Sequence, residues 1–170
     1  MQTIAEFYKV SFSQFLQDWK KCWPETSDED IQTVKTYWEK IQIPARATAG
    51  SAGYDFYVPV SFFLEEGKSV TIPTGIRAEM QPGWVLLIFP RSGLGFKHGM
   101  RLANSTGIID EDYAHADNEG HIMVKFSADK NMCLQEGDRF VQGIFLPYGV
   151  TASDRPISER RTGGFGSTGA

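Results

Sequence analysis

The sequence predicts a mainly β protein, an antiparallel barrel or sandwich of the jelly-roll kind with a helical N-terminus. After about residue 45, short apolar or alternating segments are separated by Gly, Pro, Asn and Asp. Residues 1–43 contain no glycine and repeat apolar side chains at helical spacings. From Ser153 onward the chain is polar and glycine-rich, a composition typical of a flexible arm. We therefore divide the chain into residues 1–43, 44–152 and 153–170.

Composition and charge narrow the class of protein. The chain has 170 residues, 41% of them hydrophobic, and a net charge of -4, which is ordinary for one globular core. A mildly acidic chain argues against nucleic-acid binding, since neutralising phosphates needs a basic face. No basic segment followed by an apolar run opens the sequence, and no stretch is long enough to cross a bilayer. We expect a cytoplasmic protein that binds neither nucleic acid nor a membrane.

Cysteine and histidine show no metal-binding or redox spacing. Cys22 and Cys133 lie far apart, and the three histidines follow no ligand pattern: His98, His115 and His121. We expect the cysteines to be small, partly buried thiols and the histidines not to bind a metal.

Two amphipathic helices are predicted before residue 44. In the first, the apolar positions are Phe12, Phe15, Leu16, Trp19, Cys22 and Trp23. Ser11 with Gln14 is its candidate capping box, and Pro24 stops it. Residues 1–10 fit either an earlier helical turn or a short strand.

The second helix is predicted to start at Ser27, the candidate N-cap, with Asp30 three residues later. Its apolar stripe consists of Ile31, Val34, Trp38 and Ile41, and Pro44 closes it. The two helices would form a helical hairpin. The sequence leaves open whether the hairpin packs on its own subunit, a neighbouring subunit or another protein.

Six segments have the pattern of strands, and turn residues separate them. The predicted strands are Tyr54–Val60, Ser69–Ile72, Gly75–Met80, Val85–Pro90, Ile122–Ala128 and Phe140–Pro147. The predicted turns are at Gly67, Pro73–Gly75, Pro82–Gly83 and Glu136–Asp138.

The stretch Asn104–Tyr113 is central to the functional interpretation. Alternation and the β-branched Ile108 and Ile109 favour a strand that ends near Asp110, followed by polar residues folding back as a hairpin. Such a hairpin would hold Asp110 and Tyr113 at the mouth of a pocket, while its backbone contacts a flat, polar ligand. The alternative is a surface turn, in which Asp and Gly are common.

Four further segments carry residues suited to an anionic ligand: Ala52–Asp55, Pro90–Gly95, Gly137–Gln142 and Arg160–Gly169. In the second, Arg91 offers a bidentate fork, Ser92 a hydroxyl, and Gly93 a backbone that a phosphate can approach. The third also fits a hairpin corner with a local ion pair between Asp138 and Arg139.

The last of these segments has the same chemistry. Arg160 and Ser167 suit anionic oxygens, Gly166 allows close approach, and Phe165 offers a face on which a base can stack. The alternative is a disordered end.

In order and spacing, these five segments closely resemble the five motifs of the homotrimeric deoxyuridine triphosphate nucleotidohydrolases (dUTPases) over about residues 44–170. The resemblance implies a jelly-roll-like β-barrel with a C-terminal arm. It also implies hydrolysis of dUTP to dUMP and pyrophosphate, which limits uracil incorporation into DNA and supplies dUMP for dTTP synthesis. Residues 1–43 fall outside the resemblance and would be a helical extension.

The resemblance also implies roles for the stretch 104–113. Asp110 would orient and deprotonate the water that attacks the α-phosphorus. Tyr113 would pack under the deoxyribose and leave no room for a 2′-hydroxyl. Asn104, with the backbone at Gly107 and Ile109, would contact the uracil edge and exclude thymine and cytosine.

By the same resemblance, Arg91, Ser92 and Gly93 would hold phosphates and Gln142 would contact the phosphate side. Asp55 would support the site and the subunit contact. Mg²⁺ would be bound through triphosphate oxygens and water, without direct protein ligands.

The family site is shared among subunits of a homotrimer, and the arm of one subunit closes over a pocket formed by two others. Arg160 and Ser167 would then reach the γ-phosphate while Phe165 stacks on the uracil. The neighbouring Arg161 stands where the family has a small residue, and we assign the functional arginine to Arg160 by its distance from Phe165.

A second departure is the segment 114–121, where the family continues directly with a Gly-Glu pair. It could alter access to the pocket, bind a partner, or be a tolerated loop insertion. Two alternatives to the main interpretation follow. A dCTP deaminase of related fold would need a glutamate at the base, for which Glu119 is the candidate. A regulatory protein would bind a protein partner through the N-terminal helices or the 114–121 tip.

Overall fold

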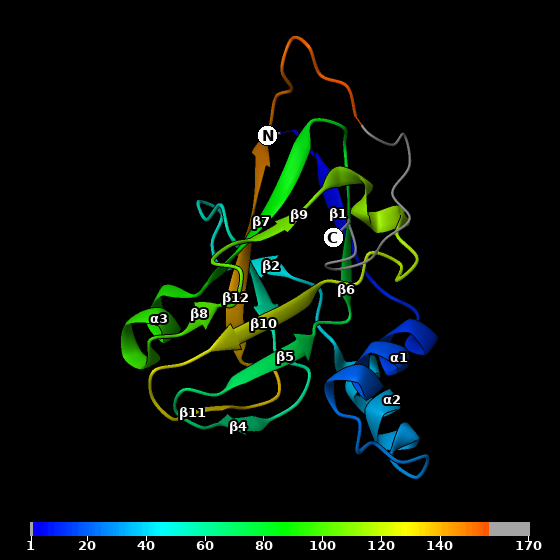
Figure 1. Ribbon diagram of the computed structural model, residues 1–170, viewed down its shortest axis with the longest axis vertical. Helices are drawn as coiled ribbons and strands as arrows, with labels where there is room; N and C mark the ends of the chain where they lie inside the picture. Colours follow the sequence, from blue (N-terminus) through cyan, green and yellow to red (C-terminus); the bar gives the residue numbers. More distant parts are fainter. Residues whose placement is uncertain (1, 157–170) are drawn as a thin grey trace.

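Antiparallel strands form most of the structure, a computed structural model that describes residues 2–156 (Figure 1). The largest sheet has the order β2-β3-β12-β7-β9, and a second has the order β5-β10-β8. Two further pairs are β1 with β6 and β4 with β11. The mainly β prediction is confirmed.

The strand bounds are β1 Ala5–Lys9, β2 Ala45–Arg46, β3 Tyr54–Tyr57, β4 Phe62–Leu64, β5 Ser69–Pro73, β6 Ile76–Met80, β7 Trp84–Pro90, β8 Arg101–Leu102, β9 Gly107–Ile109, β10 Met123–Ser127, β11 Met132–Leu134 and β12 Arg139–Pro147. The helices are α1 Phe12–Cys22, α2 Ile31–Lys40, α3 Ser92–His98 and the short 3-10 helix η1 Glu111–His115.

Helix α1 begins at the predicted position, but only one of the two hydrogen bonds of the predicted capping box forms. The Ser11 hydroxyl accepts a hydrogen bond from the Gln14 N–H at 3.1 Å, which confirms Ser11 as the N-cap. The Gln14 side chain does not complete the capping box, because it donates to Asp18 instead. Glu119 takes its place, 108 positions along the chain, and accepts the Ser11 backbone N–H at 2.7 Å.

Helix α2 begins three residues later than predicted. Asp30 occupies the N-cap position, and the expected cap, Ser27, donates both its backbone N–H and its hydroxyl to the Asp30 carboxylate at 2.8 Å. The prediction of Ser27 as N-cap is therefore wrong, because a turn outside the helix uses its hydrogen-bonding groups.

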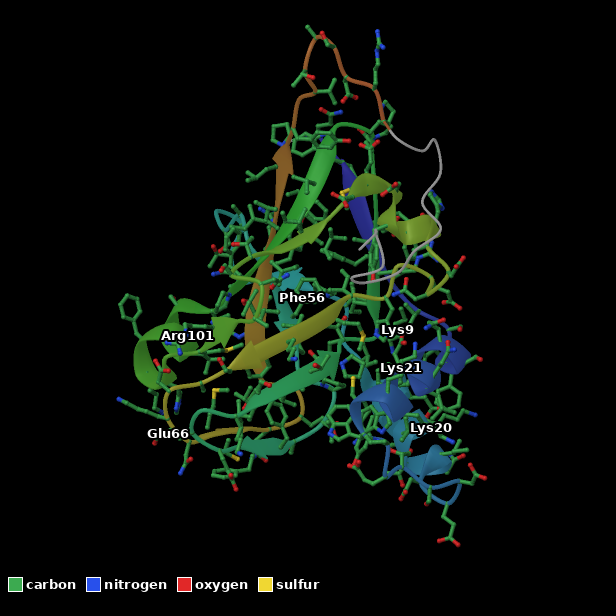
Figure 2. The ribbon with its side chains drawn as sticks, viewed as in Figure 1. Lys9, Lys20, Lys21, Phe56, Glu66 and Arg101 are labelled. Carbon is green, nitrogen blue, oxygen red and sulfur yellow. The ribbon has the colours of Figure 1, made fainter. Side chains whose placement is uncertain are left out.

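Strand β1 resolves the ambiguity of residues 1–10. It pairs with β6 in antiparallel register, with Phe7 opposite Ala78. The Phe7 ring lies 5.3 Å from that of Tyr54, 5.6 Å from Phe56 and 5.5 Å from Phe145, measured between ring centroids. The N-terminal segment thus supplies one ring of an aromatic cluster in the core of the β region (residues 44–152), where Figure 2 labels Phe56.

The two helices pack against the β region of their own chain. Phe15 and Trp19 of α1 and Val34 of α2 form a buried cluster with Val10, and Trp23 and Ile41 contact both this cluster and the main core. The Trp38 indole N–H donates to the carbonyl of Val10 at 2.9 Å. In Figure 1 both helices lie beside the β5 end of the molecule, and Figure 2 labels Lys20 and Lys21 there. The packing partner that the sequence left open is the same subunit.

A buried charged group joins α1 to the segment before β10. The His121 side chain is fully buried, and its Nδ1 lies 2.8 Å from the Asp18 carboxylate. Because His121 Nε2 accepts the Gly75 N–H at 2.8 Å, the ring proton is on Nδ1 and is donated to Asp18. Burial by itself would raise the pKa of Asp18. Hydrogen bonds from His121, Lys21 and Gln14 outweigh burial and lower this pKa to about 2.

None of the described helices is long and apolar enough to span a membrane. Cys22 and Cys133 are both free, and Cys133 is exposed. Burial raises the pKa of the Cys22 thiol to about 11, so this side chain is a neutral thiol at physiological pH.

Replacing Phe7 by Ala should cost about 3 kcal/mol of unfolding free energy, because it removes a buried ring from the core. Tyr8, on the exposed side of the same strand, is the matched control, and Tyr8→Ala should cost less than about 1 kcal/mol. Urea unfolding measures both. Equal losses in the two variants would show that β1 does not belong to the core.

Asp18→Asn should lower stability at pH 7 by about 2 kcal/mol, since a depressed pKa contributes stability above the ordinary value of the group. This contribution is lost as the pH falls toward the folded-state pKa of about 2. Urea unfolding of wild type and variant between pH 5 and pH 2 should therefore show the gap closing. A gap that stays constant over this range would contradict the assigned ionisation.

Candidate active site

A pocket of about 220 Å³ lies beside the turn that joins β8 to β9. Its wall is formed by Ile88, Leu102, Ala103, Asn104, Gly107, Ile109, Ile122, Met123, Val124 and Lys125. Three of these, Asn104, Gly107 and Ile109, are residues that the sequence predicted to contact a base. The wall is largely apolar with a few polar groups, which suits a flat heterocycle.

The pocket wall depends on the close approach of β7 and β9. Gly107 lies opposite Ile88 in the register of the two strands. A Cβ at position 107 would lie 3.0 Å from the Cβ of Ile88, so a side chain here would push the strands apart. At the preceding turn, Ser105 has a positive φ of 63°, which brings the chain back sharply.

Strand β9 ends at Ile109, and the exposed Asp110 follows it as the N-cap of η1. The strand ends near Asp110, as the sequence predicted, but the predicted hairpin does not follow it. The next strand, β10, pairs with β5 and β8 instead of returning along β9. The pocket wall includes neither Asp110 nor Tyr113, and Tyr113 is only 2% exposed. The prediction that both stand at the mouth of this pocket is therefore wrong for Tyr113, whose ring is buried.

Glu111 fixes the position of the segment after β9. Its carboxylate accepts the Gly83 backbone N–H at 2.5 Å, which ties η1 to the β6–β7 turn. A hydrogen bond with Glu111 raises the pKa of Tyr148, an exposed side chain that follows β12. The bond from Gly83 to Glu111 thus holds the segment that begins at Asp110.

A second group of predicted residues gathers at the other end of β7. The Asp55 carboxylate, 6% exposed, lies 3.1 Å from the Arg91 Nε and 3.1 Å from an Arg139 guanidinium nitrogen. Gln142 on β12 is opposite Asp55 on β3 and Phe89 on β7. One buried carboxylate therefore orients two guanidinium groups, an arrangement suited to bind phosphate.

Arg139 was not predicted as a site residue. The expected local pair with Asp138 does not form, because Asp138 accepts the Gln135 backbone N–H at 2.8 Å. Arg139 pairs instead with Asp55, 84 positions earlier. Its position beside Gln142, in a segment already singled out, is the signal that could have found it.

Ser92 and Gly93 form the first turn of α3, a helix that the sequence did not predict, and both are exposed. Arg91 is its N-cap, and the Arg91 N–H donates to the Phe140 carbonyl at 3.1 Å. Arg160, Phe165, Gly166 and Ser167, together with the arm beyond residue 156, lie outside the described residues.

The two groups of site residues are far apart within one chain. Asp110 follows Ile109, which is opposite Leu86 on β7, whereas Arg91 follows the far end of β7. At ~3.3 Å per residue, the distance along β7 is roughly 20 Å. One chain therefore does not bring Asp110 and Arg91 to the same phosphate.

Among the described residues, no group of three or more His, Cys, Asp or Glu side chains is placed to hold a metal ion. An Mg²⁺ ion commonly keeps several waters and binds through substrate phosphates, so it needs no such group. The guanidinium groups of Arg91 and Arg139 are suited to the phosphate oxygens through which such an ion would be bound.

A pocket for a flat ring and a guanidinium pair for an anion define a nucleotide-binding protein. The family model described as dUTPase matches residues 39–169, and the chain belongs to that family. The match begins inside α2, and the description of the preceding residues as an extension peculiar to this chain stays a prediction.

Curated relatives carry the same assignment. The deoxyuridine 5'-triphosphate nucleotidohydrolase of Lactococcus lactis is 44% identical over 134 residues, which is 76% of this chain and 89% of the relative. That of Shewanella baltica is 40% identical over 137 residues, covering 75% of this chain and 86% of the relative.

Solved structures agree on the fold. The dUTPase of Streptococcus mutans superposes with a TM-score of 0.62 at 32% identity, covering 86% of this chain and 98% of that one.

Asp55→Asn should raise the KM for dUTP about tenfold or more, because Arg91 and Arg139 lose the charge that orients them. The matched control is Asp129→Asn, whose carboxylate forms an exposed bidentate pair with Arg101 beside α3 (Figure 2). Exposed pairs contribute little, so its KM should be unchanged. Steady-state kinetics measures both, and equal KM values for Asp55→Asn and wild type would remove Asp55 from the site.

Proposed function

We propose that this chain hydrolyses dUTP to dUMP and pyrophosphate, with Asp110 as the general base. The observation that carries this proposal is the position of Asp110. It is an exposed carboxylate that directly follows Ile109, a residue of the pocket wall. A base in the pocket would therefore present its sugar and α-phosphate toward this carboxylate.

In the proposed reaction, Asp110 accepts a proton from a water molecule as that water attacks the α-phosphorus. The new P–O bond forms as the bond to the bridging oxygen of the β-phosphate breaks, and pyrophosphate leaves. Displacement at phosphorus needs mainly positioning and charge neutralisation, so one base and several donors suffice.

The pocket would select uracil by shape and by hydrogen bonds. The backbone at Gly107 and Ile109 and the side chain of Asn104 would contact the polar edge of the ring. The close packing of Gly107 on Ile88 leaves the wall rigid, which supports exclusion of the thymine methyl group. Cytosine presents the opposite donor and acceptor pattern along the same edge.

The guanidinium pair would bind the triphosphate. Arg91, oriented by Asp55, would contact phosphate oxygens with the exposed Ser92 and Gly93, and Gln142 would lie on the same side. An Mg²⁺ ion held by phosphate oxygens and water would neutralise part of the charge. A dUTPase of phage phi11 of S. aureus, which shares this fold at a TM-score of 0.63 and 16% identity over 92% of this chain and 99% of that one, coordinates a structural Mg(II) ion.

We propose a homotrimer with shared sites, in the cytoplasm. The distance of roughly 20 Å between Asp110 and Arg91 along β7 supports this, because a base and the phosphate donors must act within a few Å of one atom. A second copy would supply the donors. The arm with Arg160, Phe165, Gly166 and Ser167 would close over the site. Two free cysteines are usual in a reducing compartment.

Glu119, the candidate residue of the deaminase alternative, is bound to another part of the chain. Both carboxylate oxygens of Glu119 are engaged by Ser11, at 2.7 Å to its N–H and 2.6 Å to its hydroxyl. This glutamate serves the cap of α1 and is not presented to a base. A protein partner at the helices or the 114–121 tip stays a prediction.

Asp110→Asn should reduce dUTP turnover by at least about a thousandfold while dUTP binding persists, because the amide cannot accept the proton of the attacking water. Asp117→Asn, at an exposed carboxylate of the nearby tip, is the control and should retain activity. Pyrophosphate release from dUTP, dCTP, dTTP and UTP with Mg²⁺ measures the rates. Ammonia release from dCTP, or equal turnover by the Asp110 variant and wild type, would contradict the proposal.

A further inference from the structure

Glu111, the residue that follows Asp110, is bound to two other segments of the chain. Its carboxylate accepts the backbone N–H of Gly83 in the β6–β7 turn at 2.5 Å, and it accepts the phenol O–H of Tyr148. Gly83 and Tyr148 are also bound to each other, because the Gly83 carbonyl accepts the Tyr148 backbone N–H at 2.9 Å. We call these contacts among Glu111, Gly83 and Tyr148 the Glu111 anchor.

The Glu111 anchor fixes the chain immediately after Asp110, and strand pairing fixes it immediately before. Ile109 lies opposite Leu86 in the register of β9 and β7. Asp110 is extended, with a ψ of 158°, and is the N-cap of η1. In Figure 1 the β6–β7 turn, the end of β12 and η1 lie at the same end of the molecule. The backbone of Asp110 is therefore held between a paired strand and a side chain bound to a neighbouring turn.

We propose that Glu111 is a positioning residue for the reaction, and that its bond to the Gly83 N–H holds the backbone from which the Asp110 carboxylate reaches its water. The inference rests on the role proposed above for Asp110. Tyr148 is a second, weaker positioning residue, because its exposed side chain acts only through Glu111.

Glu111 is less suited than its neighbour to be the base itself. Its partly buried carboxylate already accepts hydrogen bonds from Gly83 and Tyr148, whereas Asp110 is exposed. The raised pKa of the Tyr148 phenol agrees with donation to a charged carboxylate. Two adjacent carboxylates therefore have different tasks, one in the chemistry and one in holding the chain.

The physical basis is the strict geometry of proton transfer. A general base has to lie within hydrogen-bond distance of its water as that water attacks, and a displacement of ~1 Å can cost up to about a hundredfold in rate. Without the Glu111 carboxylate, the Gly83 N–H loses this acceptor and the start of η1 loses its bond to the β6–β7 turn. The position of Asp110 relative to the pocket wall would then be less well defined.

The test is Glu111→Ala, assayed for dUTP hydrolysis with Mg²⁺. Its kcat should fall about tenfold while the KM for dUTP stays within about twofold, since the base acts on water in the transition state and does not bind the substrate. Single-turnover rates should fall equally, which excludes an effect on product release. The matched control is Asp117→Ala, at an exposed carboxylate just after η1, and it should have the kcat of wild type.

Two further variants separate positioning from loss of charge and from general damage. Glu111→Gln keeps an oxygen that can accept the Gly83 N–H, so its kcat should stay within about threefold of wild type. Tyr148→Phe removes the phenol O–H and should lower kcat less than Glu111→Ala does. In the Glu111→Ala background, Tyr148→Phe should have no further effect.

The outcomes distinguish this inference from the proposed function. A wild-type kcat for Glu111→Ala, or a loss confined to KM, overturns the inference and leaves the dUTPase assignment intact. Loss of turnover in a folded Glu111→Gln variant also overturns it, because Glu111 would then act through its charge. Absence of dUTP hydrolysis in the wild-type protein overturns the proposed function itself, and this inference with it.

Discussion

The pairing of β7 on both of its edges is the constraint on which the site depends. β12 lies along one edge and β9 along the other, so the strand cannot shift relative to either neighbour. This register places Gly107 on Ile88 and so forms the pocket wall. It also sets Arg91 beyond one end of the strand and Asp110 near the other. The same pairing that makes the pocket therefore keeps Arg91 and Asp110 apart within one chain, and this separation supports the proposed oligomer with shared sites.

The N-terminal segment is a structural part of the β region, although the family match begins only at residue 39. Phe7 completes an aromatic cluster with rings of the β region. Asp18 and Ser11 connect α1 to residues 119 and 121, which surround Tyr113. A buried carboxylate is costly unless it is hydrogen-bonded, and Asp18 has three donors that compensate for its burial. The helices and the 114–121 tip, which appeared in the sequence as two separate departures, are one connected feature.

Local patterns in the sequence predicted the strands and motif positions that depend mainly on neighbouring residues. Alternation located the long strands, and the motif residues Asn104, Gly107 and Ile109 do lie in one pocket wall. Local patterns did not predict contacts between residues that lie far apart in the sequence. Arg139 finds its partner 84 positions earlier, and Glu119 caps a helix 108 positions earlier. Helix α3 was missed because Gly93 and Gly95 have low helix propensity, although the N–H groups of Leu94 and Gly95 both donate to the Arg91 carbonyl at 3.0 Å.

The most direct test of a site built from two chains is complementation between inactive subunits. Arg91→Ala and Asp110→Asn would each be prepared, mixed in equal amounts, unfolded, refolded together and assayed for dUTP hydrolysis. If each site takes Arg91 from one chain and Asp110 from another, random assembly leaves both intact in about a quarter of the sites, and activity should return to that level. If the mixture stays as inactive as the separate variants, each site belongs to a single chain and the account is wrong.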